Sequence, residues 1–156
     1  MRLARSQVGS RLAVASRAKI RRPRPPPFGV GGETQIERVL SHAIRETGRR
    51  RVNALVFVGD AMEEKVDELC ALAGELGMLK VPAFMFQEGN EIVAEQAFRE
   101  IARLSGGAWC RFDPGAAAQL RELLRAAAAY AAGGREALKR LSAREGQAAK
   151  LLGQMK

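Results

Sequence analysis

The feature that most constrains the fold is a short apolar run at residues 52–58, which is rich in β-branched side chains and is followed by Gly59 and Asp60. A run of this length that ends at a turn residue is typical of a strand buried on both faces of a parallel sheet. In open α/β sheets, ligands bind beyond the carboxyl ends of the strands. Asp60 therefore stands where a functional carboxylate is expected, and it is the first candidate site residue.

The segments around this run alternate between helical and strand-like patterns. Strand-like runs occur at 81–86 and 108–112. Apolar residues at helical spacing occur between and around the strands, at 34–47, 60–76, 91–104 and 113–132. Strands separated by helices of this length are joined by right-handed crossovers into a parallel sheet. The sequence therefore predicts an α/β fold, a partial Rossmann-like doubly wound parallel sheet of about three strands with flanking helices. So small a sheet is expected to leave one edge of the central strand bare.

Three of the predicted helices open with a residue that can cap the helix N-terminus. Thr34 is followed three residues later by Glu37, and Asp60 by Glu63, which is the pattern of a capping box. Asp113 precedes a proline and opens the third of these helices. Because the loss of a cap costs about 0.5–2 kcal/mol, stability alone is sufficient to explain Thr34 and Asp60.

Composition divides the chain into three parts. Residues 1–28 are rich in arginine and proline, residues 29–133 hold the α/β pattern, and residues 134–156 form a helical tail that contains a glycine. We expect disorder in the first part, because its proline run cannot continue a helix, and loose docking of the tail. Three interpretations of the first part stay open: a basic tail that touches nucleic acid or an acidic surface, an organelle transit peptide, or sequence foreign to the fold. We favour the last, in which the chain is a fragment that lacks an upstream part of the domain.

Positive charge is concentrated at the start of the chain. The formal net charge is +9, and basic residues that have no acidic neighbour account for most of it: Arg2, Arg5, Arg11, Arg17, Lys19, Arg21, Arg22 and Arg24. The remaining residues are close to neutral, so a domain-wide nucleic-acid surface is not implied. Cys70 and Cys110 have no metal-ligand spacing and are expected to be small buried side chains in a reducing compartment. No apolar run reaches the ~20 residues of a membrane-spanning helix, and a cytoplasmic location is expected.

The topology is expected to bring Thr34 and Asp60 together. The helix that follows Thr34 runs antiparallel to the strand after it, so the start of that helix lies at the carboxyl edge of the sheet. A hydroxyl and a carboxylate are hard oxygen ligands, which Mg²⁺ takes directly or through water. Two such ligands by themselves would hold the ion only weakly.

Four short motifs occur in an order and at spacings that point to a known family. Residues 31–36 read Gly-Gly-Glu-Thr-Gln-Ile, and residues 55–60 form an apolar strand that ends in Asp. Residues 81–86 form a second apolar strand, and residues 98–110 lead from Phe and Ile-Ala through Ser-Gly-Gly into an aromatic strand. Together these motifs resemble the von Willebrand factor type A domain over most of the chain. One glutamate is inserted before the threonine of the family's Gly-Gly-Thr turn.

In that family, a metal-ion-dependent adhesion site gathers one Mg²⁺ from three loops, and the ion's open position accepts a carboxylate of a protein partner. The resemblance assigns the family's threonine to Thr34 and its last aspartate to Asp60. The family's first loop, Asp-x-Ser-x-Ser, has no counterpart, since no Asp precedes Thr34. The family's sheet order, 3-2-1-4-5-6, implies that the strands found here are the last three and that the neighbour of the 52–58 strand is missing. The resemblance therefore implies a remnant site with weak Mg²⁺ binding.

The sequence thus predicts a protein-binding module and not an enzyme. It is expected to bind protein partners through the remnant site and to self-associate through the bare sheet edge. One alternative is nucleic-acid binding through the basic tail, which we consider unlikely. A second alternative is phosphoryl transfer or hydrolysis on a half-Rossmann scaffold, with Asp60 as acid or metal ligand. Against the second stands the lack of a glycine-rich phosphate loop with a lysine, of a nucleophile elbow and of a Cys–His pair.

Overall fold

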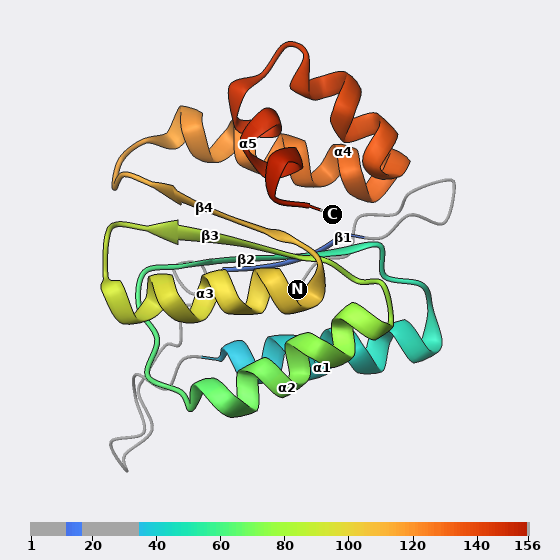
Figure 1. Ribbon diagram of the computed structural model, residues 1–156, viewed down its shortest axis with the longest axis vertical. Coiled ribbons are helices and arrows are strands. Elements are labelled where there is room, and N and C mark those ends of the chain that lie inside the picture. The colour runs from blue at the N-terminus through green and yellow to red at the C-terminus, as the bar shows by residue number, and fades with distance from the viewer. Residues whose placement is uncertain (1–11, 17–34, 156) are drawn as a thin grey trace, which may run out of the picture.

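The computed structural model describes residues 12–16 and 35–155, and helices and strands alternate along them (Figure 1). The elements are β1 (Leu12–Ser16), α1 (Ile36–Arg49), β2 (Ala54–Gly59), α2 (Val66–Met78), β3 (Ala83–Glu88), α3 (Ile92–Ser105), β4 (Ala108–Phe112), α4 (Ala117–Ser142) and α5 (Gly146–Gln154). The strands are parallel and flanked by helices, so the predicted partial Rossmann-like α/β fold is confirmed.

The strands of the described residues form one parallel sheet in the order β1-β2-β3-β4. Val56, at the centre of β2, lies between Val14 of β1 and Phe84 of β3. The three predicted strands are therefore joined by a fourth, and the expectation of disorder is wrong for Leu12–Ser16. The prediction of a bare edge on β2 is wrong for the same reason. Unpaired N–H and C=O groups on a buried strand are costly, and even a five-residue run between arginines can pair with them. The rest of residues 1–28 lies outside the described part of the chain.

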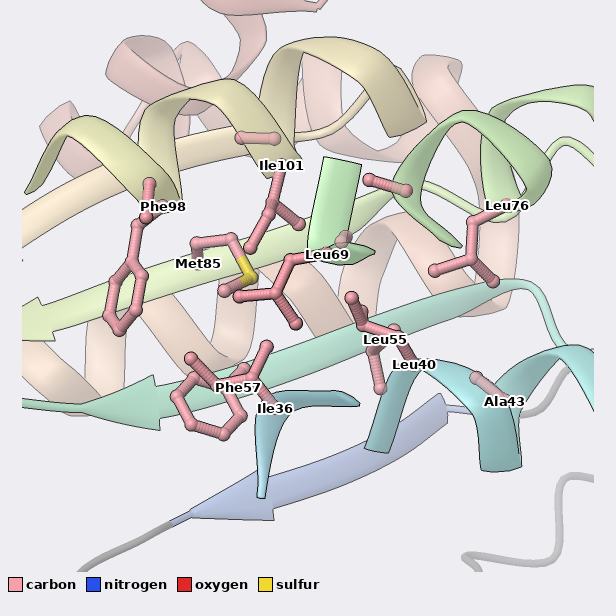
Figure 2. Close-up of a cluster of buried hydrophobic side chains, with 14 of the residues drawn as sticks. Ile36, Leu40, Ala43, Leu55, Phe57, Leu69, Leu76, Met85, Phe98 and Ile101 are labelled. Atoms are coloured by element: carbon pink, nitrogen blue, oxygen red, sulfur yellow. The ribbon is translucent and has the colours of Figure 1, made fainter. Parts of the chain in front are cut away.

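Helices α1, α2 and α3 cover one face of the sheet, which we call the first face (Figure 1). Leu55 and Phe57 of β2 and Met85 of β3 contribute to the buried cluster on this face. Figure 2 shows how they meet side chains from the three helices: Ile36, Leu40, Leu69, Leu76, Phe98 and Ile101. These side chains are large and almost fully buried, so the first face is held together by bulky apolar contacts.

Helices α4 and α5 cover the opposite face, which we call the second face (Figure 1). Here the sheet presents Val56 and Phe84, and α4 places Ala126 and Ala127 against them, all of them fully buried. The ring of Phe84 meets that of Tyr130 edge to face, with 5.6 Å between centroids. Small helix residues therefore allow α4 to lie close to large sheet residues.

The C-terminal tail completes the core on the second face. The helical path breaks at Gly134, whose φ of 69° and ψ of −160° are open to glycine but strained for other residues. Beyond the break, Leu138, Ala148 and Leu151 have no exposed surface. The expectation of a loosely docked tail is therefore wrong. Its apolar residues are spaced to face the sheet, and their burial outweighs the flexibility that a glycine inside α5 brings.

The starts of α1, α2 and α4 all differ from the capping signals in the sequence. Helix α1 has Gln35 as its N-cap instead of Thr34, a shift of one residue. Thr34 itself lies outside the described residues. Helix α4 does not begin at Asp113, because the carbonyl of Asp113 accepts a hydrogen bond from the N–H of Ala116, at 2.9 Å, and closes a turn before the helix.

Candidate functional site

The carboxyl ends of β2, β3 and β4 meet at one side of the sheet, at the arrow tips in Figure 1. We call this side the carboxyl edge. Three connections leave it toward the next helix, at residues 60–65, 89–91 and 113–116. Helices α2, α3 and α4 therefore begin on this side and turn their positive ends toward it. This is the position at which the sequence predicts a site.

Asp60 directly follows β2 and is exposed at the carboxyl edge. It does not cap a helix, because α2 begins only at Val66 with Lys65 as its N-cap. The capping box predicted from Asp60 and Glu63 is therefore wrong. The connection from β2 to α2 is instead fixed by Met62, which is 6% exposed and belongs to the core of the first face. Burying Met62 requires an irregular path, and this path leaves Asp60 on the surface.

Glu64 joins this connection to the start of α1. Its carboxylate oxygens accept hydrogen bonds from the backbone N–H groups of Ile36, at 2.9 Å, and Glu37, at 2.8 Å. A carboxylate at this position satisfies donors that have no partner inside the helix and interacts favourably with the helix dipole. The start of α1 therefore lies at the same edge as Asp60, as predicted. Thr34, two residues before Ile36, is outside the described residues, so its distance from Asp60 stays a prediction.

The connection from β3 to α3 is held by a buried glutamine. Gln87 has no exposed surface; its Nε2 donates to the carbonyl of Glu91, at 2.8 Å, and its Oε1 accepts from Nε1 of Trp109, at 3.1 Å. The carboxylate of Glu91 in turn caps α3 by accepting from the N–H groups of Val93 and Ala94. The local sequence does not predict this role for Gln87. The only signal available was a polar residue at the end of an apolar strand.

Large apolar side chains are exposed beside this edge. Ile92 is 68% exposed, Val93 52% and Val66 39%, and all three belong to the first turns of α3 and α2. The carboxylate of Glu91 and the amide of Gln87 fix the turn that carries Ile92 and Val93. Exposed apolar groups held on a rigid turn near an exposed carboxylate are suited to contact another protein.

The donors at this edge suit a divalent cation only in part. Asp60 offers a hard oxygen ligand, and Thr34 would offer a second. Glu64 and Glu91 direct their carboxylates to helix N-termini. Among the described residues, no three His, Cys, Asp or Glu side chains gather in a way that could hold a metal ion. Binding of Mg²⁺ at this edge therefore stays a prediction.

Comparisons of the chain with protein-family models, with curated proteins and with solved structures gave no match. None of the helices in the described part of the chain is both long enough and apolar enough to cross a membrane.

Proposed function

We propose that the chain is a protein-interaction module similar to a von Willebrand factor type A domain, and that it binds its partner at the carboxyl edge of the sheet. The observation that carries the proposal is the pair of hydrogen bonds from Ile36 and Glu37 to Glu64. They fasten the start of α1 to the connection that follows Asp60. The start of α1, two residues after Thr34, and the connection after Asp60 therefore meet at one edge.

The order of the strands supports the same proposal. The family's order, 3-2-1-4-5-6, places its first strand beside its fourth, and β1 lies beside β2 in the same parallel orientation. In this interpretation, β1 to β4 occupy the places of the family's strands one, four, five and six. Leu12–Ser16 then takes the place of the family's first strand, which the resemblance of the motifs had implied to be missing. No Asp-x-Ser-x-Ser follows it, so the proposed adhesion site remains a remnant.

Thr34 and Asp60 would hold Mg²⁺ directly or through water, and the ion would supply a positive charge that attracts a partner's carboxylate. With two protein donors we expect weak binding of the ion. The apolar side chains of Ile92 and Val93 then provide most of the contact with the partner, and Asp60 contributes polar specificity. A cytoplasmic location is part of this proposal.

A comparison of charge-inserting variants tests the interaction surface. Ile92→Asp disrupts the proposed surface, and Met78→Asp is the matched control, because Met78 is 86% exposed at the far end of α2. The unchanged chain and both variants are immobilised, and the proteins that each retains from a lysate are compared. We expect Ile92→Asp alone to lose specific partners. If both variants retain the same proteins as the unchanged chain, the carboxyl edge is not the binding surface.

A further inference from the structure

The free edge of β4 is occupied by a side chain instead of a strand. The N–H of Trp109 donates to Oε1 of Gln154, at 2.8 Å, and Nε2 of Gln154 donates to the carbonyl of Trp109, at 2.7 Å. One primary amide thus satisfies both backbone groups of one strand residue. In an antiparallel pair, a directly opposed residue makes these same two bonds. Gln154 therefore occupies the position that a residue of an added strand would take.

The backbone groups of successive β4 residues point alternately toward β3 and away from it, so a second residue of β4 also faces outward. The carbonyl of Phe112 accepts from the N–H of Gly89 and so points toward β3. The carbonyl of Arg111 points the other way and accepts from Nε2 of Gln119, at 3.2 Å. Trp109 and Arg111 therefore both turn their backbone groups away from β3. The amide of Gln154 on α5 covers the groups of Trp109, and the amide of Gln119 on α4 covers the carbonyl of Arg111.

A groove lies beside the start of this edge. This groove of about 460 Å³ lies between α3 and the end of α5, lined by Arg99, Glu100, Ala102, Arg103, Gly106, Gly107 and Gln154. The guanidinium of Arg99 stacks over the Trp109 ring, 4.0 Å from its centroid, and Arg103 pairs with Glu100. The groove thus carries charges of both signs. Such a lining suits a surface with the same mixture better than it suits a strongly acidic or basic peptide.

The end of α5 is fastened over the edge at several points. Leu151 is fully buried in the core of the second face, Nη1 of Arg135 donates to the carbonyl of Met155, at 2.9 Å, and Arg125 forms an ion pair with Glu145. These contacts hold Gln154 against Trp109 even though Gln154 is the last residue of its helix. The amide is therefore positioned by the fold and does not reach the edge by chance.

We infer that Gln154 is a built-in block on strand addition at β4, and that the strand it keeps out is β4 of a second copy of this chain. Two identical edges related by a two-fold axis would place Trp109 opposite Trp109 of the copy, with both backbone bonds exchanged. The mixed charges of the groove are self-complementary under the same axis. Exposed strand edges pair in this way unless something covers them. This inference concerns a different edge from the proposed binding surface and does not depend on it.

Sedimentation velocity of the chain of residues 1–156 over a concentration series tests the inference. Gln154→Ala removes both bonds to Trp109 and keeps a helix-forming residue at the end of α5. We expect this variant to form dimers with a dissociation constant lower by about tenfold or more than that of the unchanged chain. Gln96→Ala, which removes an exposed glutamine from α3, is the matched control and should leave the dissociation constant unchanged. Should Gln154→Ala lose helical circular dichroism, Gln154→Asn replaces it, since its amide is one methylene too short to reach Trp109.

A second substitution identifies the pairing edge. Arg111→Pro removes an N–H that points away from β3, and proline is tolerated on an edge strand whose N–H faces outward. In the Gln154→Ala background, we expect Arg111→Pro to restore the monomer while the helical signal is kept. The inference is overturned if Gln154→Ala remains as monomeric as the unchanged chain, or if its dimer survives Arg111→Pro.

Discussion

The two faces of the sheet are both packed with a mixture of small and large side chains, but the positions that matter most for the packing differ between them. On the first face, the strands offer Leu55, Phe57 and Met85, and three amphipathic helices answer with large side chains. On the second face, the strands again present large residues such as Phe84, and α4 packs Ala126 and Ala127 against them between buried leucines. Packing at Phe57 therefore depends on side-chain volume that cannot be removed, and packing at Ala127 on a close approach of helix and sheet that cannot be widened. The difference shows that burial alone does not define how a position tolerates change.

The largest effect is expected from removing volume on the first face. Phe57 is 1% exposed, and its ring meets that of Phe98 edge to face at 5.6 Å. Phe57→Ala should lower the free energy of unfolding by about 3–5 kcal/mol, measured by urea denaturation. Phe57→Leu keeps most of the volume and should lose clearly less. Equal losses for the two variants would mean that volume does not control stability on this face.

The next largest loss of stability is expected from adding side-chain volume on the second face. Ala127 is fully buried against the sheet, so Ala127→Leu forces α4 outward and should lower the free energy of unfolding by about 1–3 kcal/mol. Ala128 is exposed one residue later, and Ala128→Leu is the control, expected to be nearly neutral. A neutral or stabilising Ala127→Leu would show that α4 does not approach the sheet closely.

Close approach also occurs on the first face, where α2 meets α3. A Cβ added at Gly77 would lie 2.3 Å from the carbonyl oxygen of Leu104, which belongs to the backbone and cannot move aside cheaply. Gly77→Ala should therefore lower the midpoint of thermal unfolding, although alanine is the better helix former. Gly74, one turn earlier, has no atom within 4 Å of an added Cβ, and Gly74→Ala should raise the free energy of unfolding by about 0.4–1 kcal/mol. Effects of the same sign would contradict the predicted contact.

A smaller effect is expected where the first face meets the carboxyl edge. Glu64→Ala leaves the N–H groups of Ile36 and Glu37 without their carboxylate, and should lower the free energy of unfolding by about 0.5–2 kcal/mol in urea denaturation. Glu63→Ala changes the exposed neighbour and should have little effect. If Glu63→Ala is the more damaging of the two, α1 is not attached through Glu64.

The smallest effect concerns the cysteines, Cys70 on α2 and Cys110 on β4. Burial raises the pKa of both thiols above 9.0, and Cys110 is the more buried of the two. The unfolded thiols lose their protons first as the pH rises, so the stability that this shift contributes is present below about pH 9 and declines above it. At mildly alkaline pH, a thiol-specific reagent should modify Cys70 faster than Cys110, and both more slowly than in urea. Faster modification of Cys110 would show that the second face opens more readily than its packing suggests.

The sequence was informative where a local pattern had a single physical meaning. The β-branched run at 52–58 and the apolar spacing along α1 and α3 predicted elements that the structure confirms. It failed where two local meanings competed. Asp60 with Glu63 fits a capping box, yet the burial of Met62 moves the helix start to Val66. The proline run that ends residues 1–28 suggested disorder for the whole segment, yet β2 offers Leu12–Ser16 a hydrogen-bonding partner.

What the sequence determined by itself is the alternation of helices and strands from α1 to α4 and the side of the sheet on which the candidate site lies. Both follow from contacts between residues close in the chain and from the handedness of parallel crossovers. Only the tertiary structure decided that Glu64 caps α1, that Gln87 ties Glu91 to Trp109, and that an amide from α5 covers β4. Each of these contacts except that of Gln87 with Glu91 joins residues more than 20 positions apart. The residues next to a polar side chain in the sequence do not indicate which distant backbone group it will hydrogen-bond to.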